Sequence, residues 1–182
     1  MPKRQGTTLA AEVEMALPIP AEVEAVFREF RTCEFSTLAV DGTPITWPML
    51  PFFRPSTGQF MTTTSIGLPD KAFNIRRHPR VSLLFSDPTG SGLFEPPAVL
   101  VQGDAVAPDE IKTSIGGFED EIMLVYRRQP AGAMYTSNPA TRWFSDWYFM
   151  RLEITVTPRR ILWWEHGDAF SPPKVVEAIH VG

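Results

Sequence analysis

Short runs of β-branched and aromatic residues, each closed by turn residues, dominate the middle of this 182-residue sequence. Three such runs cover residues 35–40, 45–53 and 59–64, and they are separated by residues 41–44 and 55–58, which are rich in Asp, Gly and Pro. Runs of this length between turn residues are typical of antiparallel strands joined by tight turns. The sequence therefore favours a small antiparallel barrel over an alternating parallel α/β sheet.

Helical patterns flank these strands. Apolar residues recur with helical spacing after Pro20, at Val23, Val26, Phe27 and Phe30. Residues 68–78 predict a second, short helix that Pro79 ends. The later segments are predicted as strands at 81–86 and 98–107, helices within 109–126 and 139–147, and a closing strand pair, 149–157 and 160–164, broken at Pro158. The prediction is a mainly β fold of six or seven strands with helical decoration.

Composition restricts the class of protein. The net charge of -4 argues against general nucleic-acid binding, which needs a broad basic surface. No apolar run approaches the roughly 20 residues of a membrane span, and no signal peptide is recognised, so we expect no membrane partner and a cytoplasmic location. Cys33 is the single cysteine, which excludes an internal disulfide and favours a buried, inert thiol. The three histidines are far apart in the sequence, so no metal site is expected.

One domain is expected from this length. Residues 1–18 lack periodicity and are interpreted as a flexible N-terminal arm. Residues 19–166 form the predicted barrel domain, with residues 109–147 as a helical insertion, and residues 167–182 form a C-terminal tail.

The most specific chemical pattern lies between residues 62 and 81. Four consecutive hydroxyl residues end a predicted strand, namely Thr62, Thr63, Thr64 and Ser65. The short helix that follows carries four cationic residues, Lys71, Arg76, Arg77 and Arg80. Hydroxyls, the N–H groups at a helix start and a lysine together suit a phosphate. The alternative is that the threonines only favour a strand and the arginines form a solvated face.

Four blocks of the sequence, taken in order, resemble the pyridoxamine 5'-phosphate oxidase-like flavin-binding split-barrel superfamily. The blocks are residues 35–44, residues 47–52, the hydroxyl strand with residues 71–83, and residues 99–103. The resemblance covers about residues 20 to 165. It implies a six-stranded antiparallel split barrel that forms a homodimer, with two cofactors held at the subunit interface.

The resemblance also implies roles for individual residues. The ring of a flavin or deazaflavin is expected to contact the segment Trp47, Pro48, Met49, Leu50 and Pro51. The ring and phosphate are expected to contact Met61, Thr62, Thr63, Thr64 and Ser65. Lys71 is expected to pair with the phosphate, and Trp164 matches a late tryptophan of the family pattern. Residues of a partner subunit are expected to complete the pocket.

Departures from the family pattern restrict which activity the resemblance predicts. Asp70 stands where the true oxidases have an arginine, Ala98 stands where they have a glutamine, and residues 167–170 lack the basic residue that holds the vitamin. Pyridoxamine phosphate oxidase activity is therefore not expected. Residues 74–81 and 142–149 look closer to actinobacterial members, many of which use the deazaflavin coenzyme F-420. The predicted cofactor is F-420 or FMN, and the oligoglutamate tail of F-420 is expected to meet Arg76, Arg77 or Arg80.

The first functional hypothesis is an oxidoreductase that transfers a hydride between this cofactor and a small planar substrate. No catalytic residue is assigned, since Tyr148 is only a weak candidate. The aromatic residues of 143–149 fit either a substrate wall or packing. The alternatives are a non-catalytic protein that stores, carries or senses the cofactor or holds heme, and a dimeric scaffold with an empty cleft.

Overall fold

The computed structural model describes residues 18–112 and 150–177. The expected N-terminal arm, apart from residue 18, lies outside the described residues. The same is true of the predicted helices within 113–149 and of the aromatic residues 143–149 with Tyr148.

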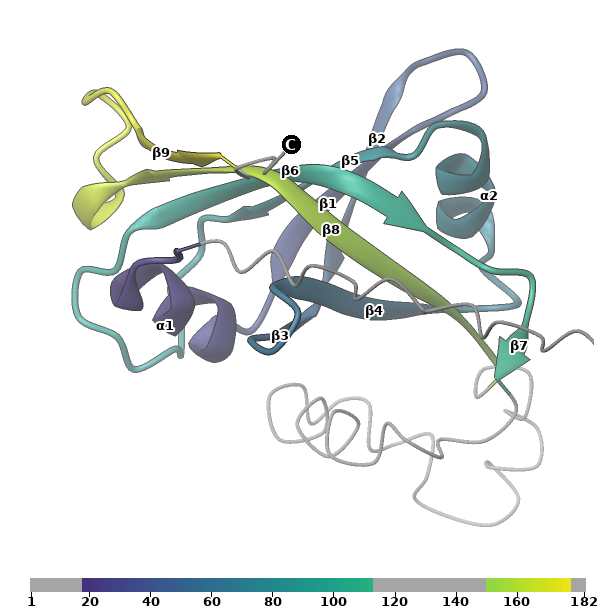
Figure 1. Ribbon diagram of the computed structural model, residues 1–182, viewed down its shortest axis with the longest axis horizontal. Coiled ribbons are helices and arrows are strands. Elements are labelled where there is room, and N and C mark those ends of the chain that lie inside the picture. The colour runs from purple at the N-terminus through teal and green to yellow at the C-terminus, as the bar shows by residue number, and fades with distance from the viewer. Residues whose placement is uncertain (1–17, 113–149, 178–182) are drawn as a thin grey trace, which may run out of the picture.

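The described strands form one curled antiparallel sheet, which confirms the mainly β split-barrel prediction (Figure 1). They are β1 (Cys33–Leu38), β2 (Pro44–Met49), β3 (Phe52–Arg54), β4 (Gln59–Ser65), β5 (Arg80–Phe85), β6 (Ala98–Val106), β7 (Ile111–Lys112), β8 (Arg151–Trp164) and β9 (Lys174–Glu177). Their order in the sheet is β2-β1-β5-β6-β8-β4-β3, and β7 and β9 also pair with β8. The sheet thus has nine described strands rather than six or seven, because short edge strands are added to the predicted set.

Two helices accompany the sheet, close to the predicted ranges. Helix α1 (Ala21–Glu29) lies beside β3 and buries its apolar stripe. Its Phe27 ring lies 5.2 Å, 4.8 Å and 5.1 Å, centroid to centroid, from the rings of Phe53, Phe60 and Phe85. Helix α2 (Asp70–Arg77) contacts β1 and β6. An aromatic cluster therefore fills the core beneath α1, and α2 lies toward the other end of the sheet (Figure 1).

The predicted strand 45–53 is wrong as a single element, because it divides into β2 and β3 on either side of Leu50 and Pro51. β2 pairs with β1, whereas β3 pairs with β4. The chain therefore changes its hydrogen-bonding partner at this point, and Pro51 has no N–H with which to continue a ladder.

The predicted break at Pro158 is also wrong, since β8 runs unbroken from Arg151 to Trp164. Pro158 pairs opposite Gly103, where the register between β6 and β8 shifts. A β-bulge tolerates a proline because the ladder is already interrupted there. An added Cβ at Gly103 would lie 2.4 Å from the Thr157 carbonyl oxygen, so glycine permits the close approach.

Two further differences concern the ends of predicted segments. The helix expected from Asp109 is wrong at its described start, where Ile111 and Lys112 form β7 against β8. Within the residues expected as a tail, Lys174–Glu177 form β9, whose Val175 and Val176 pair with Leu162 and Ile161. Pairing across the sheet therefore determines both segments.

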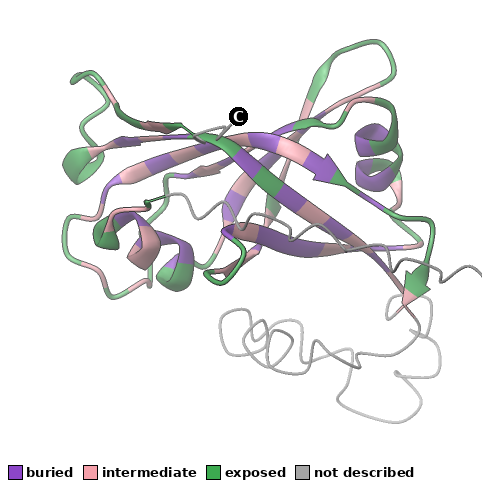
Figure 2. Ribbon diagram, in the orientation of Figure 1, coloured by how far each residue is buried: buried purple, intermediate pink, exposed green. Residues whose placement is uncertain are grey.

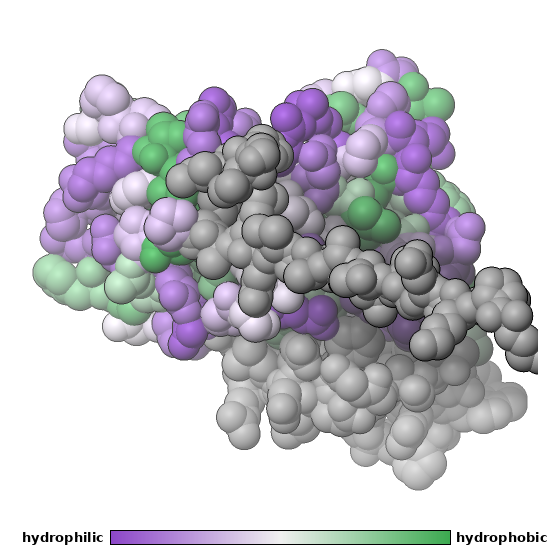
Figure 3. Space-filling model, in the orientation of Figure 1, coloured by the Kyte–Doolittle hydropathy of each residue, from purple (hydrophilic) through white to green (hydrophobic). Residues whose placement is uncertain are grey.

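Burial alternates along the central strands, so one face of the sheet meets the core and the other faces outward (Figure 2). On the inner face, Leu83, Val101 and Ile161 are fully buried neighbours. Cys33 is buried as expected, and burial raises the pKa of its thiol, with Glu34 adding to the effect. In the view of Figure 3, the described hydrophobic residues form separate patches among hydrophilic ones.

Candidate functional site

The end of β4 and the start of α2 bring the predicted hydroxyl residues into a buried turn. Thr62, Thr64 and Ser65 are all buried. The Thr64 hydroxyl donates to the Leu68 carbonyl at 2.7 Å, and the Ser65 hydroxyl accepts from the Gly67 N–H at 3.2 Å. These two hydroxyls therefore hold the turn that leads into α2. Thr63 is half-buried on the same strand.

Lys71 is the central cation of this region. It lies in the first turn of α2 with 8% of its surface exposed, and its Nζ sits 4.6 Å from the centroid of the Trp47 ring. Burial lowers the pKa of this ammonium, Asp70 partly opposes that shift, and Arg151 adds to it. Among the described residues, Lys71 makes no ion pair and donates no hydrogen bond. A buried ammonium without an ion pair or hydrogen bond costs free energy unless an anion binds beside it.

The segment expected at the cofactor ring lies beside this cation. Trp47 and Met49 are half-buried on one side of β2, while Pro48 points to the other side and is exposed. Leu50 is buried, and its carbonyl oxygen lies 3.5 Å from the Thr62 hydroxyl. Met61, on β4, is buried between its strand neighbours Phe52 and Thr155. The structure thus brings the ends of β2 and β4 together with the start of α2.

The arginines of α2 have partners within the protein. Arg76 donates from Nε to the Ala107 carbonyl at 2.7 Å and from Nη2 to the Pro108 carbonyl at 2.8 Å, and it pairs with Asp109 at 2.6 Å. Arg77 donates to the Asn74 amide oxygen at 2.7 Å. These contacts tie α2 to the end of β6 and to its own buried face.

Asn74 extends this network into the core. Its side-chain nitrogen donates to the Thr37 hydroxyl at 3.0 Å, and both side chains are buried. Arg80, just after the helix, pairs instead with Asp104 at 3.4 Å. All three arginines that sequence reasoning offered to a cofactor tail therefore also serve contacts within the protomer.

Trp164 lies away from the other predicted site residues. It ends β8 immediately before the short 3-10 helix η2 (Glu165–Gly167), and its strand partner is Ala98. Strand β9, which pairs with this part of β8, and helix α2 lie at opposite ends of the sheet (Figure 1). Within one protomer the structure therefore brings Trp47 to Lys71 but does not bring Trp164 there.

Sequence reasoning missed two features of this site. Arg151 pairs with Ser65 across β4 and β8, although 86 positions separate them in the sequence, so no local pattern reveals it. The sequence pattern places Asn74 in a helix motif, whereas in the structure its side chain is the buried link between α2 and β1. Only the tertiary structure shows both features, the first as a strand pair and the second as a side-chain hydrogen bond.

The described residues offer neither a membrane-spanning helix nor a metal-binding cluster. No described helix has the length and apolar character to cross a membrane. Within residues 18–112 and 150–177, no group of three or more His, Cys, Asp or Glu side chains is placed to hold a metal ion.

Comparison with known proteins gives no matching family model and no matching curated protein. Solved structures do match. A Clostridium acetobutylicum protein related to general stress protein 26, of the pyridoxinephosphate oxidase family, aligns with TM-score 0.54 at 11% identity over 86% of this chain and 92% of that chain. An F420 reductase aligns with TM-score 0.52 at 20% identity over 79% of this chain and 98% of that chain.

A heme binding protein from Mycobacterium smegmatis also matches, with TM-score 0.50 and 16% identity over 88% of this chain and 59% of that chain. At these identities the likeness concerns the fold. The chain has the split-barrel fold of the pyridoxamine phosphate oxidase-like proteins.

Proposed function

We propose that this protein is an oxidoreductase that binds F-420 or FMN and transfers a hydride between that cofactor and a small planar organic substrate. The observation that carries the proposal is Lys71, a buried cation that has Arg151 close enough to lower its pKa and no anionic partner of its own among the described residues. Both cofactors carry a phosphate that would supply the missing anion.

The surrounding groups fit a phosphate. Helix α2 begins without a side-chain cap, which leaves the first-turn N–H groups for a ligand. The hydroxyl residues at the end of β4 hold the turn that leads into this helix start. Trp47, which already contacts the Lys71 ammonium, and the segment through Leu50 offer an apolar wall and backbone groups to a planar ring.

In this proposal the bound cofactor supplies the hydride chemistry, and the protein binds and orients it. Lys71 holds the phosphate, β2 orients the ring, and the buried ends of β2 and β4 keep water from that side. No side chain is assigned as an acid or base.

A homodimer completes the proposed site. Trp164 is expected at the cofactor, yet it lies toward the opposite end of its own sheet from α2. A second protomer would bring its own Trp164 to the Lys71 region of the first. Leu84, Leu100 and Leu162 are half-buried neighbours on the outer face of the sheet and offer apolar surface for such an interface.

Titration of FMN and F-420, separately, into the wild type and Lys71→Ala tests this proposal. A charge-assisted phosphate contact in a partly desolvated site contributes enough that the variant should bind about ten- to a hundredfold more weakly. Lys112→Ala is the control, because Lys112 is a lysine of β7 that pairs with Glu110. Equal dissociation constants for all three proteins would reject the assignment of Lys71.

The same titration tests the choice of cofactor. F-420 carries an oligoglutamate tail that FMN lacks. Of the two arginines of α2, Arg77 donates to the Asn74 side chain, whereas Arg76 contacts Ala107, Pro108 and Asp109. Arg77→Ala should weaken F-420 binding by up to about fivefold, as expected for an exposed ion pair, with little effect on FMN. Equal losses for the two cofactors would favour FMN.

The second candidate function is a non-catalytic cofactor carrier or sensor, or a heme binder. The described residues of the site, Trp47 to Leu50, Met61 to Ser65, Lys71 and Arg151, include no histidine, cysteine or carboxylate to act as an acid or base. One solved structure with this fold is a heme binding protein. Turnover of the reduced cofactor with a quinone or a nitroaromatic compound would support the oxidoreductase, whereas binding without turnover would support the carrier.

A further inference from the structure

The hairpin that joins β1 to β2 carries the single Asp-Gly pair of the sequence at its tip. Asp41 and Gly42 are exposed, and the neighbouring Val40 has 76% of its surface exposed. The loop extends beyond the sheet beside α2 (Figure 1). Exposed loop tips are the parts of a fold that reagents and enzymes reach most readily.

Gly42 closes the turn at this tip. Its N–H donates to the Ala39 carbonyl at 2.9 Å, and its φ of 83° is a left-handed conformation that favours glycine. A turn closed by such a glycine is a common three-residue hairpin loop. A Cβ added at Gly42 would meet no atom within 4 Å, so the space around this residue is open.

The Asp41 side chain folds back along the backbone of the same turn. Its Oδ1 accepts a hydrogen bond from the Thr43 N–H at 3.0 Å. This Asx turn spans Gly42, the residue between the two partners. The Asp41 carboxyl group is therefore held on the side of the Gly42 nitrogen rather than turned toward solvent.

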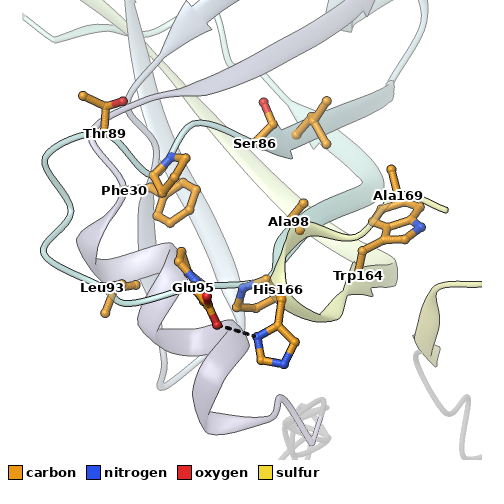
Figure 4. A pocket seen from close by; sticks show the side chains of 14 residues that line it. Phe30, Ser86, Thr89, Leu93, Glu95, Ala98, Trp164, His166 and Ala169 are labelled. Atoms are coloured by element: carbon orange, nitrogen blue, oxygen red, sulfur yellow. Dashed lines mark ion pairs between the residues drawn. The ribbon is translucent and has the colours of Figure 1, made fainter. Parts of the chain in front are cut away.

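Two other exposed aspartates make the same turn. Asp87 Oδ1 accepts from the Thr89 N–H at 2.9 Å, and Asp168 Oδ1 accepts from the Phe170 N–H at 3.0 Å. Both turns adjoin a cavity of about 610 Å³ toward the end of the sheet away from α2. The lining of this cavity includes Thr89, Trp164, His166 and Ala169 (Figure 4).

The residue that follows each aspartate distinguishes the three turns. It is Gly42 in the hairpin, and Pro88 and Ala169 in the other two. Proline has no N–H to lose, and the Cβ of alanine crowds the approach of its own nitrogen to a neighbouring carbon. Of the three, only Gly42 combines a backbone N–H with the absence of a Cβ.

We propose that Asp41 is a modification site, at which the Gly42 nitrogen attacks the side-chain carboxyl carbon and converts Asp41 into isoaspartate. A C–N bond forms, the carboxyl group loses a hydroxyl, the nitrogen loses its proton, and a five-membered succinimide and one water result. Water then opens the ring at the main-chain carbonyl. The backbone afterwards runs through the former Asp41 side chain, and the α-carboxylate is free.

The partner that fits this product is an enzyme that methylates isoaspartyl carboxylates, because the hairpin tip exposes the new carboxylate. The reaction needs no oxidant, no reductant and no reagent besides water. It is independent of the proposed cofactor function, since the hairpin tip, residues 39–43, contains none of the proposed site residues.

Methyl labelling of the full chain after incubation at physiological temperature and mildly acidic pH measures the reaction. The probe is a protein isoaspartyl methyltransferase with radiolabelled S-adenosylmethionine, and peptide fragmentation assigns each isoaspartate to its position. Position 41 should accumulate isoaspartate about tenfold faster than position 168, which corresponds to about 1.4 kcal/mol in the activation free energy. Position 87 should accumulate none, because Pro88 has no N–H. A rate at position 41 no greater than that at position 168 would overturn the proposal.

Two variants test the role of the Asp-Gly pair. Asp41→Ser keeps a side-chain oxygen for the Thr43 N–H but has no carboxyl carbon to attack, so the label at the hairpin should vanish. Ala169→Gly creates a second Asp-Gly pair in an exposed Asx turn and should raise the rate at position 168 about tenfold. Labelling at the hairpin that persists in Asp41→Ser, or an unchanged rate at position 168 in Ala169→Gly, would contradict the assignment.

Discussion

At the residue scale, burial of the Lys71 side chain disfavours the charged form of its amine. Because burial lowers its pKa in the folded protein, the unfolded chain holds the proton more tightly. The contribution of Lys71 to the free energy of unfolding is therefore lowest at pH values where the lysine is protonated in both the folded and the unfolded protein. It rises as the pH increases from the lowered pKa of the folded protein to the ordinary value of 10.5. A binding lysine that costs stability is consistent with a site shaped for a ligand.

We expect Lys71→Met to raise the melting temperature of the cofactor-free protein at neutral pH, because it replaces a buried ammonium with an apolar side chain. The advantage should shrink as the pH approaches 10.5. Thermal melts across this range would measure it. A variant that is less stable than the wild type at neutral pH would show that the Lys71 contact with Trp47 outweighs desolvation.

His166 permits a test of backbone strain. Its φ of 53° suits glycine, and its ion pair with Glu95 is exposed and contributes little. We expect His166→Gly to be neutral or to stabilise by up to about 1 kcal/mol, because relief of strain offsets the flexibility that glycine adds to the unfolded chain.

Thr89→Gly in the neighbouring loop is the comparison, because Thr89 has no positive φ and lies on the same cavity. It should destabilise by roughly 0.5 to 1 kcal/mol. Urea denaturation of the two variants measures the difference. If His166→Gly loses as much stability as Thr89→Gly, then the left-handed conformation of His166 is not strained.

At the scale of the element, the position of α2 decides where Lys71 lies. The helix is eight residues long and depends on tertiary contacts, which Asn74 provides through Thr37 and Arg76 provides through the end of β6. Because Lys71 and Asn74 are three positions apart, they lie on neighbouring parts of one helix face. The buried amide thus positions the cation.

Asn74→Ala should destabilise the protein by about 1 to 3 kcal/mol, since it leaves the buried Thr37 hydroxyl without its partner. Cofactor affinity should fall as well, because α2 is less firmly held. Arg77→Ala removes only the outer end of this network and should cost less stability. Denaturant unfolding compares the two, and equal losses would place the anchor at Arg77 rather than at Asn74.

At the scale of the whole molecule, the outer face of the sheet is where a second protomer is expected. Leu84, Leu100, Leu162 and Val175 form a row of adjacent strand partners on this face. Leu100→Glu places a charge in the middle of that row and should convert a dimer into a monomer with weakened cofactor binding, because the partner no longer supplies Trp164.

Sedimentation velocity with a cofactor titration measures both effects. Val40→Glu is the control, because Val40 is 76% exposed beside the turn between β1 and β2. A wild-type protein that is monomeric at micromolar concentration and still binds cofactor would contradict the dimer.

The sequence alone determined the elements whose signals are local. The alternating runs predicted the antiparallel barrel, the apolar spacing predicted α1, and the hydroxyl run followed by Lys71 marked the candidate phosphate site. Side-chain periodicity and turn chemistry specify such features because they depend on residues a few positions apart. The sequence indicated both Trp164 and Lys71 as site residues, but it did not reveal that they lie far apart within one protomer.

Only the tertiary structure decided which segments pair. Pro158 does not break β8, because Gly103 lies opposite it at a bulge, and residues 174–177 form a strand because they pair with β8. Arg151 pairs with Ser65, and Glu95 lies beside His166. Both pairs are too far apart in the sequence to form a local pattern. Long-range hydrogen-bonding partners and positive backbone dihedrals are properties of the folded chain, so the cavity beside Trp164 appears only in the structure.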